Sequence, residues 1–164
     1  MRKRNRSERA PRAGWPASCF LLFVDGITSV QKGRCGLPKS VLIVDDEKLL
    51  VRTLSNALKE AGYRITVAGS AEQADKHVFG DPPFDLILLD NRLPKESGME
   101  VVKRVRDRAV KSKVILMTAY ETPDVKAEAK RLKVERYLKK PFDLTVLLEE
   151  IHSLIGNGEG LTAG

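Results

Sequence analysis

Acidic residues that follow short apolar segments are the positions with the clearest chemical potential in this sequence of 164 residues. Asp45 and Asp46 follow the apolar segment 41–44, and Asp90 follows the mostly apolar segment 84–89. A carboxylate can act as a nucleophile and carry a phosphoryl group as an acyl phosphate. Three neighbouring carboxylates repel one another, and a hard divalent cation such as Mg²⁺ or Mn²⁺ relieves that repulsion. These residues predict a metal-dependent phospho-acceptor, with Asp90 as the nucleophile.

Two further residues could serve the same chemistry. Thr118 ends the apolar segment 114–117, and Lys140 stands before Pro141, which restricts the backbone of the residue preceding it. Phosphoryl transfer depends on positioning and charge neutralisation. A lysine and a hydroxyl can provide both. Taken singly, an Asp pair can equally be a helix cap and a lysine a solvated side chain. Their common position at segment ends favours a shared site.

The elements that must position these residues alternate strictly after residue 39. Period-two or continuous apolar segments predict strands, and apolar residues at helical spacing predict helices. Strands are expected over 41–44, 63–68, 84–89, 114–117 and 136–139, and helices over 47–61, 70–79, 98–107, 123–132 and 143–155. Such alternation predicts an α/β fold with a five-stranded parallel sheet and helices on both faces. Ligands bind such sheets at the carboxyl ends of the strands, where the acidic residues, Thr118 and Lys140 are expected.

Three segments are expected along the chain, and they differ in charge. Residues 1–39 read as a basic, disordered leader, residues 40–155 as the folded domain and residues 156–164 as a flexible tail. The leader contains the whole formal excess of seven positive charges, so the folded domain has no general attraction for nucleic acid. No apolar run approaches the roughly 20 residues that span a bilayer. Both cysteines lie in the leader, which favours a cytoplasmic location.

The ordered region resembles the receiver domain of two-component response regulators, in particular the single-domain type of chemotaxis and sporulation phosphorelays. The matching motifs are Val44-Asp45-Asp46-Glu47, Leu89-Asp90 with Pro94 and Gly98, Met117-Thr118-Ala119, and Lys140-Pro141-Phe142. The resemblance implies a flavodoxin-like sheet with strand order 2-1-3-4-5.

The resemblance also implies a role for each site residue. Asp90 is the phospho-acceptor, Asp46 binds the metal directly, Asp45 binds it largely through water, and the backbone carbonyl of Arg92 completes the protein ligands. Thr118 and Lys140 contact the phosphoryl group.

Tyr137 matches the family's aromatic switch position, although an aromatic residue packed on a short edge strand would look the same. On phosphorylation, Thr118 is expected to move toward the new group and Tyr137 to turn inward.

Two features set this chain apart within that pattern. Lys133 replaces the glycine that usually precedes the fifth strand, so either the turn avoids a positive φ or Lys133 is strained. Arg92 and Tyr120 occupy positions that tune the loss of the phosphoryl group in similar proteins. A bulky Tyr120 predicts a long-lived phospho-form.

The leading interpretation is a stand-alone response regulator, phosphorylated by a sensor histidine kinase and signalling through the face of helix four, strand five and helix five. It would not be a turnover enzyme and would lose its phosphoryl group only slowly. An alternative is a phosphorelay intermediate that passes the group to a histidine phosphotransfer protein. A phosphohydrolase is disfavoured because Arg92 cannot act as an acid or base. DNA binding through the leader is disfavoured because the leader lacks a helix-turn-helix pattern.

Overall fold

The computed structural model describes residues 38–80, 83–108 and 110–156. Most of the predicted leader (residues 1–37) and most of the predicted tail (residues 157–164) lie outside the described residues. The first described strand begins at Ser40 and the last helix ends at Ile155.

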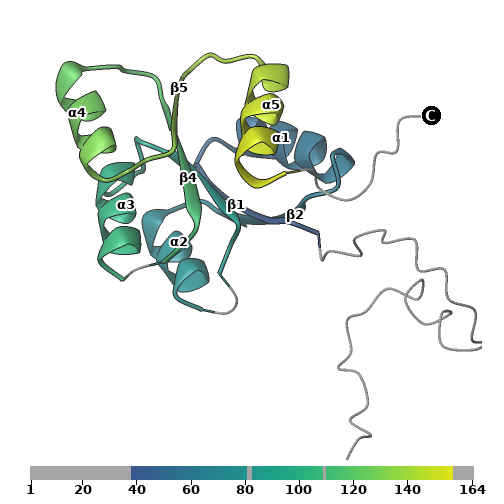
Figure 1. Ribbon diagram of the computed structural model, residues 1–164, viewed down its shortest axis with the longest axis horizontal. Helices are drawn as coiled ribbons and strands as arrows, with labels where there is room; N and C mark the ends of the chain where they lie inside the picture. Colours follow the sequence, from purple (N-terminus) through teal and green to yellow (C-terminus); the bar gives the residue numbers. More distant parts are fainter. Residues whose placement is uncertain (1–37, 81–82, 109, 157–164) are drawn as a thin grey trace, which may run out of the picture. The chain divides into compact units, whose positions relative to one another are not determined.

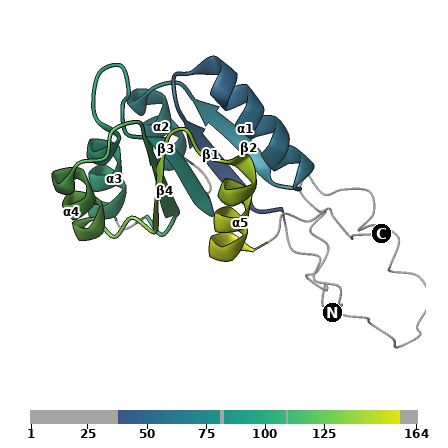
Figure 2. The ribbon, with the colours of Figure 1, turned by 90° about the horizontal axis from the view of Figure 1, so that it is seen from above.

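The described residues form five parallel strands and five helices in strict alternation. The strands are β1 (Ser40–Val44), β2 (Arg64–Ala68), β3 (Leu86–Asp90), β4 (Lys113–Thr118) and β5 (Arg136–Lys139). The helices are α1 (Lys48–Glu60), α2 (Ala71–Val78), α3 (Gly98–Asp107), α4 (Pro123–Arg131) and α5 (Leu144–Ile155). The strand order β2-β1-β3-β4-β5 confirms the predicted fold class and topology. Helices α1 and α5 cover one face of the sheet, and α2, α3 and α4 cover the other (Figures 1 and 2).

The central strands explain why the fold forms. All residues of β1 and β3 are buried, as expected for parallel strands covered on both faces. Their side chains alternate between two apolar clusters. Leu42 and Leu89 pack on the side of α2 and α3, whereas Ile43 and Leu88 pack on the side of α1 and α5. The predicted strand 84–89 is wrong at its start, because Asp85 lies before β3 and uses its carboxylate to accept hydrogen bonds from Ser40.

Gly62 ends α1 in the manner that the sequence predicts. Its φ is 84°, in the left-handed region, where glycine has no steric penalty. The N–H of Gly62 bonds the carbonyl of Lys59 at 2.9 Å, and the N–H of Tyr63 bonds that of Leu58 at 3.0 Å. This pair of bonds is a Schellman motif, which satisfies carbonyls at the helix end. We refer to it as the Gly62 turn.

The turn after α4 has the same hydrogen bonds around a lysine. Lys133 has a φ of 53°, so of the two alternatives that the sequence left open, the turn keeps the positive φ. The N–H of Lys133 bonds the carbonyl of Lys130 at 3.1 Å, and that of Val134 bonds the carbonyl of Ala129 at 2.9 Å. A non-glycine residue in this region costs roughly 1–3 kcal/mol unless its surroundings hold it there. We refer to it as the Lys133 turn.

Candidate functional site

The sheet register brings the predicted acidic residues to one edge. Val44 pairs with Leu89, so the carboxyl ends of β1 and β3 lie side by side. One carboxylate oxygen from each of Asp45, Asp46 and Asp90 lies within 4.8 Å of the others. Asp45 and Asp90 are buried, whereas Asp46 is exposed. The backbone holds two of these carboxylates in place: the N–H of Glu47 bonds Asp45 at 2.8 Å, and the N–H of Arg92 bonds Asp90 at 3.1 Å.

Lys140 joins this acidic cluster from the end of β5. Its Nζ lies 2.6 Å from Asp45 Oδ2 and 3.1 Å from Asp90 Oδ1. Its own N–H bonds the carbonyl of Thr118 at 2.7 Å, which fixes the backbone from which the side chain extends. The peptide bond between Lys140 and Pro141 is cis. The predicted lysine thus lies between two of the predicted acids, although 95 residues separate it from Asp45.

The environment shifts the pKa values of Asp90 and Lys140. Burial raises the pKa of Asp90 above its ordinary value, the carboxylate of Asp45 adds to this, and the ammonium of Lys140 opposes it. Burial alone would lower the pKa of Lys140, but its hydrogen bonds to Asp45 and Asp90 outweigh burial and raise it. Lys140 is therefore a permanent positive charge at neutral pH, placed where an incoming anion would meet Asp90.

Thr118 and Tyr137 lie next to each other beside the acidic cluster. Thr118 is fully buried, and its hydroxyl donates to the carbonyl of Tyr120 at 2.9 Å while accepting from the N–H of Tyr120 at 3.2 Å. The Tyr137 hydroxyl is shielded from solvent and makes no well-formed hydrogen bond with the described residues. Burial raises the pKa of Tyr137, and the nearby Thr118 side chain opposes that change. The Tyr137 hydroxyl is therefore already shielded in this structure, and the inward turn expected on phosphorylation stays a prediction.

Arg92 and Tyr120 form a cover at the rim of the site. The Arg92 guanidinium carbon lies 5.0 Å from the centre of the Tyr120 ring, a cation–π arrangement. Beneath this pair is a shallow hollow that Asn91, Thr118, Thr122 and Val125 also line. The predicted metal-ligand role of the Arg92 carbonyl stays a prediction, since the contact seen here is that of its N–H with Asp90.

Gly98 is a site residue whose role the sequence reading missed. Its N–H bonds the carbonyl of Asn91 at 2.9 Å, and the N–H of Asn91 bonds the carbonyl of Met117 at 2.8 Å. A Cβ at Gly98 would collide with the backbone carbonyl oxygen of Asp90 and lie 3.0 Å from the Cα of Asn91. The sequence showed a glycine at a helix start, but only the folded backbone shows that α3 begins against the residue that bears the nucleophile.

The chemistry of the donor set fits a hard divalent cation. The acidic cluster offers oxygen atoms and no nitrogen or sulfur, which favours Mg²⁺ or Mn²⁺ over Zn²⁺. The exposed carboxylate of Asp46 leaves a solvent-facing side for a hydrated ion.

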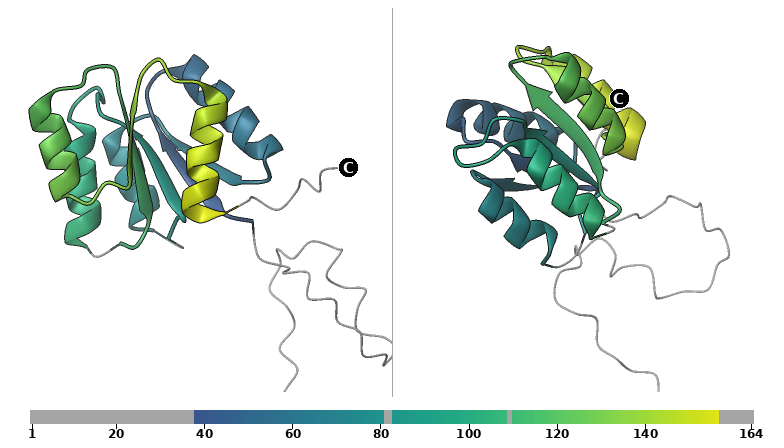
Figure 3. Two further views of the ribbon diagram at one scale, coloured as in Figure 1. Left: turned by 45° about the horizontal axis from the view of Figure 1, so that its top comes forward. Right: turned by 90° about the vertical axis from the view of Figure 1, so that its left-hand side faces the viewer.

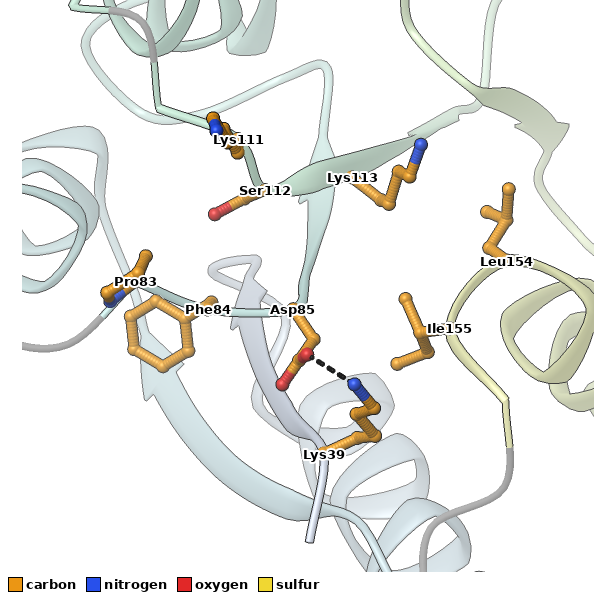
Figure 4. A pocket seen from close by; sticks show the side chains of 9 residues that line it. All are labelled: Lys39, Pro83, Phe84, Asp85, Lys111, Ser112, Lys113, Leu154 and Ile155. Atoms are coloured by element: carbon orange, nitrogen blue, oxygen red, sulfur yellow. Dashed lines mark hydrogen bonds and ion pairs between the residues drawn. The ribbon is translucent and has the colours of Figure 1, made fainter. Parts of the chain in front are cut away.

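A second hollow lies at the opposite edge of the sheet, near the amino ends of β3 and β4 (Figure 4). Lysines 39, 111 and 113 surround it, and Lys39 bonds Asp85 at 3.0 Å. Burial raises the pKa of the Asp85 carboxyl, but hydrogen bonds from Ser40 and Lys39 outweigh burial and lower it. None of the predicted site residues lines this hollow, so we assign the predicted chemistry to the carboxyl edge alone.

The fold and the site together define a class: an α/β domain with a 2-1-3-4-5 parallel sheet (Figure 3). At the carboxyl edge of that sheet lies an acidic cluster with a lysine. The family model for the response regulator receiver domain matches residues 41–152. The chain belongs to this family, which confirms the resemblance inferred from its motifs.

Relatives and solved structures agree with this assignment. The transcriptional regulatory protein PmrA of Pectobacterium parmentieri is 34% identical over 120 residues, covering 73% of this chain and 54% of that protein. The regulatory protein AtoC of Escherichia coli K12 is 38% identical over 107 residues, covering 65% of this chain and 23% of that protein. The chemotaxis protein CheY4 of Vibrio cholerae has 28% identity and a TM-score of 0.66, covering 71% of this chain and 98% of that structure.

The chain spans about half or less of the length of these curated relatives, so the match concerns their receiver domains. Among the described residues, no helix has both the length and the apolar character needed to cross a bilayer.

Proposed function

We propose that this chain is a phosphorylation switch in which Asp90 accepts a phosphoryl group from a sensor histidine kinase or a histidine phosphotransfer protein. The observation that carries the proposal is the convergence of Asp45, Asp46 and Asp90 within 4.8 Å, with Lys140 bound to two of them. Such a concentration of charge, with Asp45 and Asp90 buried, is costly to maintain and is typical of functional sites. Receiver domains interact with sensor histidine kinases, and the particular kinase is a matter for experiment.

The residues of the site have different roles in phosphoryl transfer. The bond from phosphorus to the donor imidazole nitrogen breaks, its electron pair stays with that nitrogen, and a new bond forms to a carboxylate oxygen of Asp90. Asp45, Asp46, Asp90 and the backbone carbonyl of Arg92 would hold Mg²⁺, which would supply positive charge to the transferring phosphoryl group. Lys140 provides a second, permanent charge, already positioned by its bond to Asp90.

Thr118 would couple the new phosphoryl group to the surface. To donate to a phosphoryl oxygen, its hydroxyl must turn its single O–H away from the carbonyl of Tyr120. Tyr120 leads into α4, so the loop before α4 is expected to change first. Because the Tyr137 hydroxyl is already shielded, we propose that switching alters what Tyr137 packs against rather than simply moving its ring inward.

The central test uses the protein with Mg²⁺ and a small acyl-phosphate donor. The wild type should gain the mass of one phosphoryl group, and Asp90→Asn should gain none, because an amide lacks the nucleophilic oxygen. Intact-protein mass spectrometry measures both. Equal gain by the two proteins, or no gain by the wild type, would reject the proposal.

Tyr120→Ala should shorten the lifetime of the phospho-form by about two- to fivefold, the loss expected for a cation–π contact of roughly 0.5–1 kcal/mol. Removing the ring also opens the rim of the site to water. Decay of the phosphorylated mass after removal of the donor measures the effect. Tyr120→Phe keeps the ring and should decay at the wild-type rate; an unchanged rate in Tyr120→Ala would contradict the predicted role of this residue.

Leu49→Ala should slow phosphoryl transfer from a partner kinase by at least about tenfold, since an exposed leucine that becomes buried against a partner contributes roughly 1.5–3 kcal/mol. Leu49 is 77% exposed in the first turn of α1, three residues after Asp46, which a donor must approach. The same variant should react normally with a small acyl phosphate, which needs no protein contact. Equal slowing with both donors would place the defect in the site instead.

The output of the switch is a further proposal. A hollow beside Tyr137 is lined by basic residues (Lys126, Lys130 and Arg136) and by Glu121 and Glu135, so we propose that the face of α4, β5 and α5 binds a partner with charges of both signs. The names of PmrA and AtoC describe transcriptional or regulatory proteins that are longer than this chain, which supports a signalling role without assigning DNA binding to the receiver. Stand-alone action, onward relay, a cytoplasmic location and the absence of catalytic turnover stay predictions.

A further inference from the structure

The Lys133 turn joins α4 to β5 and therefore lies within the proposed switch face. It has the same pair of hydrogen bonds as the Gly62 turn, but without the glycine that makes a positive φ inexpensive. The two turns form a natural comparison within one molecule. Whatever holds the Lys133 turn must lie outside the turn's own backbone.

Arg106, near the end of α3, contacts this turn through two nitrogens of its guanidinium group, Nε and Nη2. Nε donates to the carbonyl of Leu132 at 3.1 Å and Nη2 to that of Lys133 at 3.1 Å. These are carbonyls at and just beyond the end of α4, where helical partners run out. Nη1 donates to the carbonyl of Ser112, just before β4, at 2.9 Å. The planar guanidinium group of arginine holds its donors in a fixed geometry and can reach all three carbonyls at once. The ammonium group of lysine is a compact charge on a flexible chain and lacks that geometry.

Glu135 completes the arrangement on the other side. Its Oε2 accepts from Arg106 Nη2 at 3.0 Å and from the N–H of Val114 at 2.6 Å. The side chains of Arg106 and Glu135 are only 22% and 21% exposed, so solvent screens this pair less than a surface ion pair. The start of β4, the end of α3 and the entry to β5 are thereby tied to one guanidinium group.

The rest of α4 is held weakly by comparison. Within this helix, every residue of which the structure describes, Ala129 alone is buried, and it lies in the last turn and a half. At the other end, Val125 is half-buried, and the Lys126 side chain pairs with Glu121 at 2.7 Å on the surface. Helices α3 and α4 lie side by side on the same face of the sheet (Figures 1 and 3). The one buried side chain of α4 thus lies at its carboxyl end, whereas its amino end is held by the Thr122 cap and by half-buried Val125.

We infer that Arg106 is a positioning residue that clamps the Lys133 turn and makes the carboxyl end of α4 a fixed pivot. The clamp holds whether or not the chain is phosphorylated. The pivot rests on the proposed function: when Thr118 leaves the Tyr120 backbone, the amino end of α4 moves while the clamped end stays.

The clamp is tested by amide hydrogen exchange followed by NMR in the full chain. In Arg106→Met, the amides of Lys133 and Val134 should exchange at least about tenfold faster, the effect of losing charged hydrogen bonds worth roughly 1.5–3 kcal/mol. The amides of Gly62 and Tyr63, in the matching turn, should not change. Arg106→Lys should behave like Arg106→Met, because charge alone cannot replace the fork.

A second variant separates clamping from general stability. Adding Lys133→Gly to Arg106→Met should restore slow exchange at residues 133 and 134, since glycine accepts the positive φ without help. Faster exchange at the Gly62 turn as well, or no rescue by glycine, would show a merely structural arginine and overturn the clamp.

The pivot is tested by comparing exchange before and after phosphorylation, with mass spectrometry first confirming that the phosphoryl group is present. Exchange should rise at the amino end of α4, around Val125 and Lys126, and stay unchanged at Lys133 and Val134. In Arg106→Met, the rise should extend through the whole helix. Uniform change along α4 in the wild type would overturn the pivot; failure to gain a phosphoryl group would instead reject the proposed function and leave the clamp result standing.

Discussion

Gly98→Ala should lower the free energy of unfolding by about 1–3 kcal/mol or more and abolish most phosphoryl acceptance at Asp90. The added methyl group would occupy the space of the Asp90 carbonyl oxygen. Neither segment can yield easily, because Gly98 is bonded to Asn91 and Asn91 to Met117. Relief of the collision must therefore displace the backbone that carries Asp90. Chemical denaturation and the mass gain with an acyl phosphate measure the two effects.

Gly69→Ala is the matched control for this substitution. A Cβ at Gly69 would meet only the flexible end of Gln73, at 3.7 Å, an ordinary van der Waals distance. Its φ lies outside the left-handed region, so alanine is not strained there. This variant should keep wild-type stability to within about 0.5 kcal/mol and accept the phosphoryl group normally. Equal loss in both variants would show that the close packing at Gly98 is not the cause.

Lys140→Met should slow phosphoryl transfer to Asp90 by about 10²- to 10³-fold, the usual cost of removing a preorganised charge from a transition state. The same variant should bind Mg²⁺ more tightly than the wild type. In the wild type, the Lys140 ammonium already neutralises part of the charge of Asp45 and Asp90, and a cation must share those oxygens with it. Metal affinity and transfer rate are therefore expected to change in opposite directions. Calorimetric Mg²⁺ titration and the rate of mass gain measure them.

Lys139→Met provides the control for charge. Lys139 is the last residue of β5 and is exposed, whereas the Lys140 side chain is only 17% exposed. Removing its charge should leave both metal affinity and transfer rate within about twofold of the wild type, because exposed charges are screened by water and salt. If Lys140→Met weakens Mg²⁺ binding, the ammonium is not competing with the cation, and the account of the site's charge balance is wrong.

The order of the strands and helices followed from local patterns of apolar residues and glycine, which the sequence contains directly. The apolar segments before Asp45 and Asp90 predicted buried strands, and Gly62 predicted the end of the first helix; the structure shows both. Parallel strands joined by helices also imply one common edge for their carboxyl ends. Residue type and spacing therefore sufficed to name the acidic residues, Thr118 and Lys140 as neighbours.

Contacts between distant segments could not be predicted in the same way. They depend on strand register and side-chain packing, whereas the spacing of apolar residues along the chain predicts only local elements. Sequence showed Lys133 in place of glycine, and the tertiary structure decided that the positive φ is kept and that Arg106, 27 residues earlier, bonds the turn. Packing likewise placed Gly98 against the Asp90 backbone and engaged Thr118 with Tyr120.

The sequence by itself determined which groups can do the chemistry. The tertiary structure decided how they are held, because side-chain geometry is set by whatever the fold packs around each residue.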